Sequence, residues 1–114
     1  MGLALRFNYN DAPKNAAMNF TGKTVLVTGG SRGIGRAIAT AFAEKGARVA
    51  ILYRSNQAAA DATLAALNGT SHLSIQADIA DAQQVTEAVN SVISSFECLD
   101  IVVNNAGIGI YHPI

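Results

Sequence analysis

The stretch Thr24-Val-Leu-Val-Thr-Gly-Gly-Ser-Arg-Gly-Ile-Gly35 decides the fold, because an apolar run passes directly into closely spaced glycines. Residues 24–28 carry no charge and are rich in β-branched side chains, as expected for a strand that is covered on both faces. After the glycines, residues at helical spacing are Ile34, Ile38, Ala41, Phe42 and Lys45. The stretch therefore predicts a buried strand, a tight turn and an amphipathic helix over 33–46 that Gly46 ends.

The alternation of strand and helix continues along the chain. Further strands are predicted at 48–53, 72–77 and 100–104, and a helix at 56–67. Asp81 is expected to cap a helix whose buried stripe comprises Val85, Ala88, Val89, Val92, Ile93 and Phe96. Right-handed crossovers turn this order into an α/β fold of Rossmann type, a parallel sheet of order 3-2-1-4 with helices on both faces. A ligand crevice is expected beyond the ends of the first and fourth strands.

Length and composition favour one small globular domain. The chain has 114 residues, of which 50% are hydrophobic and 14% charged. We expect a loose N-terminal extension at 1–20 and a partial dinucleotide-binding domain at 21–114. The net charge of zero argues against a nucleic-acid partner. No apolar run is long enough to span a bilayer and no secretory signal is evident, so the default expectation is the cytoplasm, with an organelle left open.

The cysteine and histidine pattern predicts no metal site. Cys98 is the only cysteine, which excludes an internal disulfide and a thiolate cluster. His72 and His112 lack the spacing of a zinc site. No basic residue adjoins Cys98 in the sequence, so a reactive thiol is not expected there.

The glycine spacing suits a loop that holds a pyrophosphate. Gly29 permits a tight turn, Gly33 lets the backbone approach the phosphates, and Gly35 lets the helix lie close to the sheet. Unpaired N–H groups at the start of the helix would then face the anion. The spacing G-x-x-x-G-x-G differs from the general dinucleotide fingerprint, and the alternative is a turn that binds nothing.

The residues after the second strand indicate which dinucleotide is bound. A site for NAD(H) usually has an acid at this place, but the chain reads Tyr53-Arg54-Ser55-Asn56. Arg54 and Arg32 can bind a 2′-phosphate through charge-assisted hydrogen bonds, with Ser31 and Ser55 as neutral donors. Each arginine could instead be a solvated surface charge. The pattern favours NADP(H) over NAD(H).

Three motifs together resemble the short-chain dehydrogenase/reductase family, most closely its 3-oxoacyl-[acyl-carrier-protein] reductase-like members. They are the glycine stretch 28–35, the segment Ala77-Asp78-Ile79 and the segment 99–107, Leu-Asp-Ile-Val-Val-Asn-Asn-Ala-Gly. The resemblance implies that the cofactor phosphates lie against residues 29–35, and above all against Gly29, Gly30, Ser31, Arg32 and Ile34. It also implies that adenine and its ribose lie against Asp78, Ile79, Asn105, Ala106 and Gly107. Asn104 is expected to tie the fourth strand to its neighbours, and Asp78 could instead be an ordinary loop or cap acid.

The catalytic residues that the resemblance implies cannot be placed in this chain. The family uses a serine and a tyrosine with a lysine four residues later, and none of Tyr9, Tyr53 and Tyr111 is followed by such a lysine. We therefore expect the cofactor-binding part of a longer reductase, truncated after the fourth strand, which binds NADP(H) without reducing a ketone. The alternatives are a stand-alone NADP(H)-binding module and an interaction module. The latter would self-associate or pair with a homologous chain through the bare sheet edge at 100–104.

Overall fold

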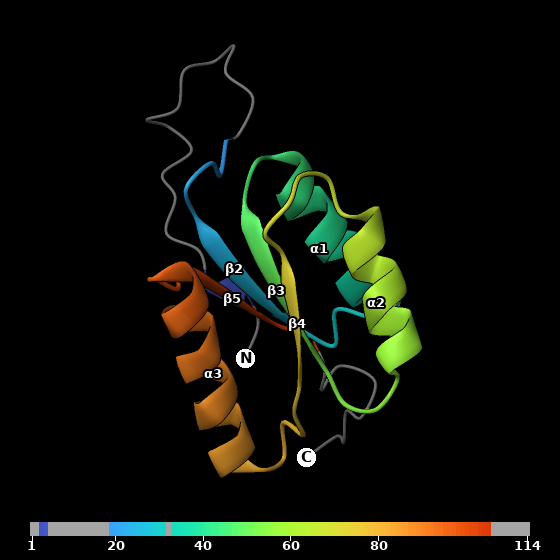
Figure 1. Ribbon diagram of the computed structural model, residues 1–114, viewed down its shortest axis with the longest axis vertical. Coiled ribbons are helices and arrows are strands. Elements are labelled where there is room, and N and C mark those ends of the chain that lie inside the picture. Colours follow the sequence, from blue (N-terminus) through green and yellow to red (C-terminus); the bar gives the residue numbers. More distant parts are fainter. Residues whose placement is uncertain (1–2, 5–18, 32, 106–114) are drawn as a thin grey trace.

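Four parallel strands form the centre of the molecule (Figure 1). The computed structural model describes residues 3–4, 19–31 and 33–105. The four strands are β2 (Thr24–Thr28), β3 (Arg48–Tyr53), β4 (Leu73–Gln76) and β5 (Ile101–Asn104). They lie in the order β4-β3-β2-β5, with every neighbouring pair parallel. The predicted order 3-2-1-4 is thereby confirmed, and β2 and β3 have the predicted bounds.

Helices cover both faces of this sheet. Figure 1 shows α1 (Gly33–Glu44) and α2 (Gln57–Ala66) on one side and α3 (Ala82–Phe96) on the other. Successive strand residues point to opposite faces, so alternate positions of β2 enter different cores. Val25 and Val27 pack in the core beneath α1 and α2, whereas Leu26 packs with α3. This two-sided burial explains why β2 reads as a continuous apolar run.

The helix ends follow the predicted signals. Asp81 accepts hydrogen bonds from the N–H groups of Gln83 and Gln84, which confirms it as the cap of α3. Gly46 lies just beyond α1 with φ +95°, a conformation that favours glycine. Ile93 was predicted to lie on the buried stripe of α3, but it is 43% exposed. Among the described residues, no helix is both long and apolar enough to cross a membrane.

A fifth strand corrects the expectations for the N-terminus and for the sheet edge. Residues Leu3–Ala4 form β1, which pairs antiparallel with β5 through Leu3 opposite Val103 and Ala4 opposite Val102. Leu3 and Ala4 of the predicted extension therefore lie in the sheet, and the edge of β5 is covered opposite Val102 and Val103. An unpaired apolar edge offers free N–H and C=O groups, which even a two-residue segment of the same chain can satisfy. At Val102 and Val103, the edge that was expected to pair with another chain is already paired with β1.

The four parallel strands give the sheet two distinct ends. All four finish at the same end, called here the carboxyl end, and each helix begins there (Figure 1). The opposite end, where the strands start, is called the amino end. At the amino end, backbone hydrogen bonds join neighbouring segments; for example, the N–H of Arg48 donates to Lys23 O at 2.9 Å. The candidate site residues that the structure describes lie at the carboxyl end, as the fold predicts.

Candidate functional site

The connection between β2 and α1, residues 29–33, is called here the glycine loop. Gly29 turns the chain out of the strand with φ +67°, and its N–H donates to Leu52 O on β3 at 2.8 Å. A Cβ on Gly30 would come within 2.6 Å of the Ile51 side chain. The loop therefore needs glycine at both places, at the first for the positive φ and at the second for space.

Gly35 brings α1 close to the sheet, as the sequence predicts. A Cβ at this position would lie 2.7 Å from the carbonyl carbon of Gly29 and 2.6 Å from Asn105 Nδ2. Both distances are shorter than any that real side chains tolerate. The first turn of α1 thus packs directly against the backbone at the end of β2 and the side chain that follows β5.

The N-terminus of α1 is open and lacks a negative charge of its own. A Cβ on Gly33 would meet no atom of the described residues within 4 Å, and Ile34 is 65% exposed. The first turn of α1 contains no acid. The first N–H groups of a helix have no partner within the helix and carry its partial positive charge. These features suit a bound anion such as a phosphate group.

Thr28 joins β2 to the end of β5, and the sequence analysis did not single it out. Its hydroxyl lies 3.2 Å from Asn104 Oδ1 and accepts a hydrogen bond from Asn105 N–H at 2.8 Å. Asn105 Nδ2 lies 3.4 Å from Gly29 O. The prediction that Asn104 ties the fourth strand to its neighbours is confirmed. Asn105 holds the start of the glycine loop as well, so this amide and hydroxyl network joins the ends of β2 and β5 to the glycine loop.

Arg54 and Ser55 are exposed just beyond β3, next to the glycine loop. Leu52, whose carbonyl oxygen accepts the N–H of Gly29, lies two residues before Arg54, so the two segments leave neighbouring strands at the same end. The carbonyl of Arg54 accepts a hydrogen bond from Gln76 Nε2 on β4 at 3.1 Å. A basic side chain and a hydroxyl therefore stand where an acid would suit a free ribose.

Asp78 and Ile79 follow β4 at the same end. The Oδ1 atom of Asp78 accepts the N–H of Ala80 at 2.9 Å, and Gln84 Oε1 accepts the N–H of Asp78 at 2.9 Å. This local turn is the alternative that the sequence left open for Asp78. Ile79 is 39% exposed beside it. Contact of these two residues with adenine stays a prediction, and Arg32, Ala106 and Gly107 lie outside the described residues.

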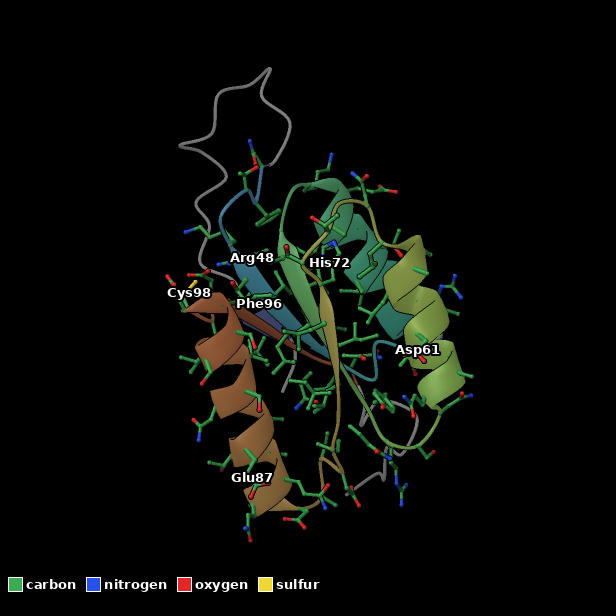
Figure 2. The ribbon with its side chains drawn as sticks, viewed as in Figure 1. Arg48, Asp61, His72, Glu87, Phe96 and Cys98 are labelled. Carbon is green, nitrogen blue, oxygen red and sulfur yellow. The ribbon has the colours of Figure 1, made fainter. Side chains whose placement is uncertain are left out.

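The amino end of the sheet contains a different set of side chains, which Figure 2 shows gathered near the end of α3. Arg48 donates to Phe96 O at 2.8 Å, and its guanidinium carbon lies 4.9 Å from the centre of the Phe96 ring. The same guanidinium reaches Cys98 Sγ at 4.0 Å. The expectation that no basic group adjoins Cys98 is therefore wrong in space, although it holds along the sequence.

Comparison with known proteins agrees with this geometry. The family model for short chain dehydrogenases matches residues 23–114. The 3-oxoacyl-[acyl-carrier-protein] reductase FabG of Staphylococcus aureus is 46% identical over 88 residues, which are 75% of this chain and 36% of that protein. Versicolorin reductase of Emericella nidulans is 44% identical over 89 residues, 76% of this chain and 34% of that protein. The chain thus spans about a third of the length of these relatives.

Solved structures show the same arrangement. A short chain dehydrogenase from Burkholderia cenocepacia in complex with NADP is 47% identical, with a TM-score of 0.72 over 80% of this chain and 38% of that one. The 3-ketoacyl-(acyl-carrier-protein) reductase from Brucella melitensis, complexed with NADH, is 32% identical, with a TM-score of 0.66 over 71% of this chain and 32% of that one. One of these two structures thus contains the phosphorylated dinucleotide NADP, and the other contains NADH, which lacks the 2′-phosphate.

Proposed function

This chain belongs to the short-chain dehydrogenase family, and we propose that its glycine loop binds the pyrophosphate of NADP(H). The observation that carries the proposal is the open N-terminus of α1. It has no acid in its first turn, and no atom of the described residues would meet a Cβ on Gly33 within 4 Å. The backbone N–H groups at the start of α1 supply the donors, because anions bind where a helix leaves its first N–H groups unpaired.

The preference for NADP(H) over NAD(H) rests on the end of β3. Arg54 and Ser55 are exposed there, and the sequence of the glycine loop, which follows the neighbouring strand β2, includes Ser31 and Arg32. A guanidinium forms short, charge-assisted hydrogen bonds with a phosphate, and no carboxylate follows Tyr53 to accept bonds from a free 2′-hydroxyl. The structures solved with NADP and with NADH show that relatives of this fold take either dinucleotide.

The adenosine part of the cofactor belongs on the other side of the crevice. We place adenine beside Asp78 and Ile79, and its ribose beside Asn105, Ala106 and Gly107. One carboxylate oxygen of Asp78 is engaged by Ala80. The second oxygen is the proposed acceptor for the exocyclic amine of adenine.

The reaction is proposed for the whole protein of which this chain spans the cofactor-binding part. Bound NADPH would supply a hydride to the carbonyl carbon of a 3-oxoacyl group or a similar ketone. The 3-oxoacyl reductase relatives support this substrate class. No tyrosine of the chain has a lysine four residues after it, so the 114-residue chain is expected to bind the cofactor without reducing a ketone. Ketone-dependent oxidation of NADPH by the purified chain would contradict that expectation.

A binding titration tests the cofactor assignment. NADPH and NADH are titrated by fluorescence into the chain and into its Arg54→Gln variant. We expect R54Q to weaken NADPH binding by about tenfold, the effect of one charge-assisted bond, with little change for NADH. The Lys45→Gln variant is the control, because Lys45 is an exposed cation beyond the far end of α1. Equal loss for both dinucleotides in R54Q, or no NADPH binding by the unaltered chain, would count against the proposal.

A further inference from the structure

Thr63 connects α2 to the glycine loop, although no motif points to it. Its hydroxyl donates to the carbonyl oxygen of Ser31 at 2.7 Å, across 32 residues of sequence. Thr63 is fully buried and Ser31 is only 8% exposed, so solvent does not replace the bond. A buried carbonyl that loses its donor is unfavourable because neither protein nor water then satisfies it.

The direction of this bond distinguishes Thr63 from other helical hydroxyl groups of the chain. Thr40 donates to Arg36 O at 2.9 Å, and Thr86 donates to Ala82 O at 2.9 Å. Both bonds run to the carbonyl four residues earlier in the same helix, as is usual for threonine. Thr63 instead reaches out of its helix to a loop. Its hydroxyl therefore constrains the loop rather than its own helix.

The bond completes the attachment of the glycine loop. Gly29 is held at the start of the loop by Leu52 O on β3 and by Asn105 Nδ2 beyond β5. Thr63 holds Ser31, two residues later, from the helix layer. A peptide group is planar, so a fixed Ser31 carbonyl also fixes the plane of the peptide bond that follows it. The loop is thus attached to three different elements of the fold.

The same helix also follows directly from the segment that carries Arg54. Asn56 caps α2 by accepting the N–H of Ala59 at 2.9 Å, and the carbonyl of Arg54 is held by Gln76. A rigid α2 therefore links Arg54 and Ser55, just before its N-terminus, to Ser31 through Thr63. The two sides of the proposed 2′-phosphate pocket are set relative to each other by this one helix.

We propose that Thr63 is a positioning residue that sets the preference of the site for NADP(H) over NAD(H). It touches no part of the cofactor and acts through the carbonyl of Ser31. This inference rests on the proposed function, because it requires that the pocket between the glycine loop and Arg54 takes a 2′-phosphate. Loss of the hydroxyl should let the two sides separate, which weakens contacts to the 2′-phosphate more than contacts to the pyrophosphate.

The test compares Thr63→Val with Thr63→Ser in titrations of the 114-residue chain with NADPH and with NADH. Valine keeps the shape of threonine but leaves the Ser31 carbonyl without a donor, whereas serine keeps the hydroxyl. We expect T63V to weaken NADPH binding by about tenfold and NADH binding by about twofold, as for loss of one buried hydrogen bond at the pocket. T63S should retain the ratio of the two affinities. If T63V does not fold, Thr63→Ala replaces it, with the same expected fall in the ratio.

A stability control separates positioning from simple loss of structure. Val92→Ala creates a cavity under α3, on the other face of the sheet from α2, and should lower stability without changing the ratio of affinities. An unchanged ratio in the hydroxyl-free variants, or a ratio that falls equally in T63S or V92A, would overturn the role of Thr63 and leave the proposed function standing. A chain that fails to prefer NADPH before any substitution would overturn the proposed function and this inference together.

Discussion

The two ends of the sheet are built from opposite kinds of residue. At the amino end, Arg48 lies over the Phe96 ring and binds its carbonyl, and Thr24 N–H donates to Asp100 Oδ2 at 2.9 Å. Charged and aromatic side chains fill that end and join β2, β3 and α3. At the carboxyl end, between β2 and β5, glycines take the place of larger side chains, and neutral hydroxyl and amide groups such as Thr28 form the side-chain bonds.

This difference separates stability from binding along the same strands. At the amino end, the polar groups form hydrogen bonds with one another and so leave few donors for a ligand. The carboxyl end keeps backbone N–H groups and free space beside Gly33. Parallel strands bring their carboxyl ends to one edge, where the following helices also begin. Substitutions at the two ends should therefore have separable effects on unfolding and on cofactor affinity.

The largest effect is expected for Gly35→Ala at the carboxyl end. The added Cβ would lie 2.6 Å from Asn105 Nδ2 and 2.7 Å from the Gly29 carbonyl carbon, so α1 must move away from the sheet. We expect a loss of about 3 kcal/mol in the free energy of unfolding, at the upper end of the usual range for overpacking. Urea denaturation measures this loss, and NADPH titration should show at least about a tenfold weaker affinity, equivalent to ~1.4 kcal/mol.

Gly22→Ala at the amino end is the matched control for Gly35→Ala. Gly22 has φ +81°, and a Cβ there would meet none of the described atoms within 4 Å. The substitution should cost about 1 kcal/mol of left-handed backbone strain and leave NADPH affinity unchanged. A Gly35→Ala chain as stable as Gly22→Ala would contradict the close approach of α1 to the sheet.

An intermediate effect is expected for Arg48→Met at the amino end. Methionine keeps part of the contact with Phe96 but removes the bond to its carbonyl. We expect the free energy of unfolding to fall by about 2 kcal/mol, as for a hydrogen bond to a charged group. The free energy of unfolding of Arg48→Lys should lie between those of Arg48→Met and the unaltered chain, because lysine keeps the charge but not the planar group.

Cofactor titration of the same Arg48 variants sharpens the comparison. Arg48 lies at the opposite end of β3 from Arg54, so NADPH affinity should stay within about twofold of the unaltered chain. A large loss of affinity in Arg48→Met would show that the two ends are not independent.

The smallest effect concerns Asp81, which caps α3 at the carboxyl end. The pKa of its carboxyl is lowered from 3.8 by the backbone N–H of Gln84 first, then by the Gln84 side chain and the Gln83 N–H. The lowered pKa means that this carboxylate stabilises the fold at pH values above about 4, and that the contribution is lost as the pH falls through the lowered pKa. Asp81→Asn should show a smaller drop in melting temperature than the unaltered chain between pH 7 and pH 3. Equal drops in both proteins would rule out this role.

More of the fold than of the candidate site could be predicted from the sequence. The bounds of β2 and β3 were predictable because strands buried on both faces read as nearly uninterrupted apolar runs. The end of α1 near Gly46 and the start of α3 at Asp81 were predictable from local capping rules. Local rules could not find β1, because its two residues are a strand only through their pairing with β5. Ile93 shows a similar limit, because helical spacing cannot tell how far the sheet extends beneath a helix.

The site residues divide in the same way. The roles of Gly35 and Asn104 followed from short motifs whose partners lie at predictable strand ends. Thr63 and Arg48 act through partners far away in the sequence, Ser31 and Phe96, and their residue types gave no signal of it. Asp78 was left open by the sequence, and the structure shows one of its oxygens in a local turn.

The position of β5 between β2 and β1 has a consequence for how the chain folds during synthesis. β2, β3 and β4 leave the ribosome in sequence and can pair as each one emerges, whereas β2 must wait for its other neighbour until β5 is made. β1 leaves first, yet its partner is the last of the described strands, so Leu3 cannot pair until Val103 has been added. Contacts of such high sequence separation form slowly because the intervening chain must be ordered first. On the nascent chain, one edge of β2 therefore stays unpaired until β5 arrives, and β5 then pairs with both β2 and β1, the first of the described strands.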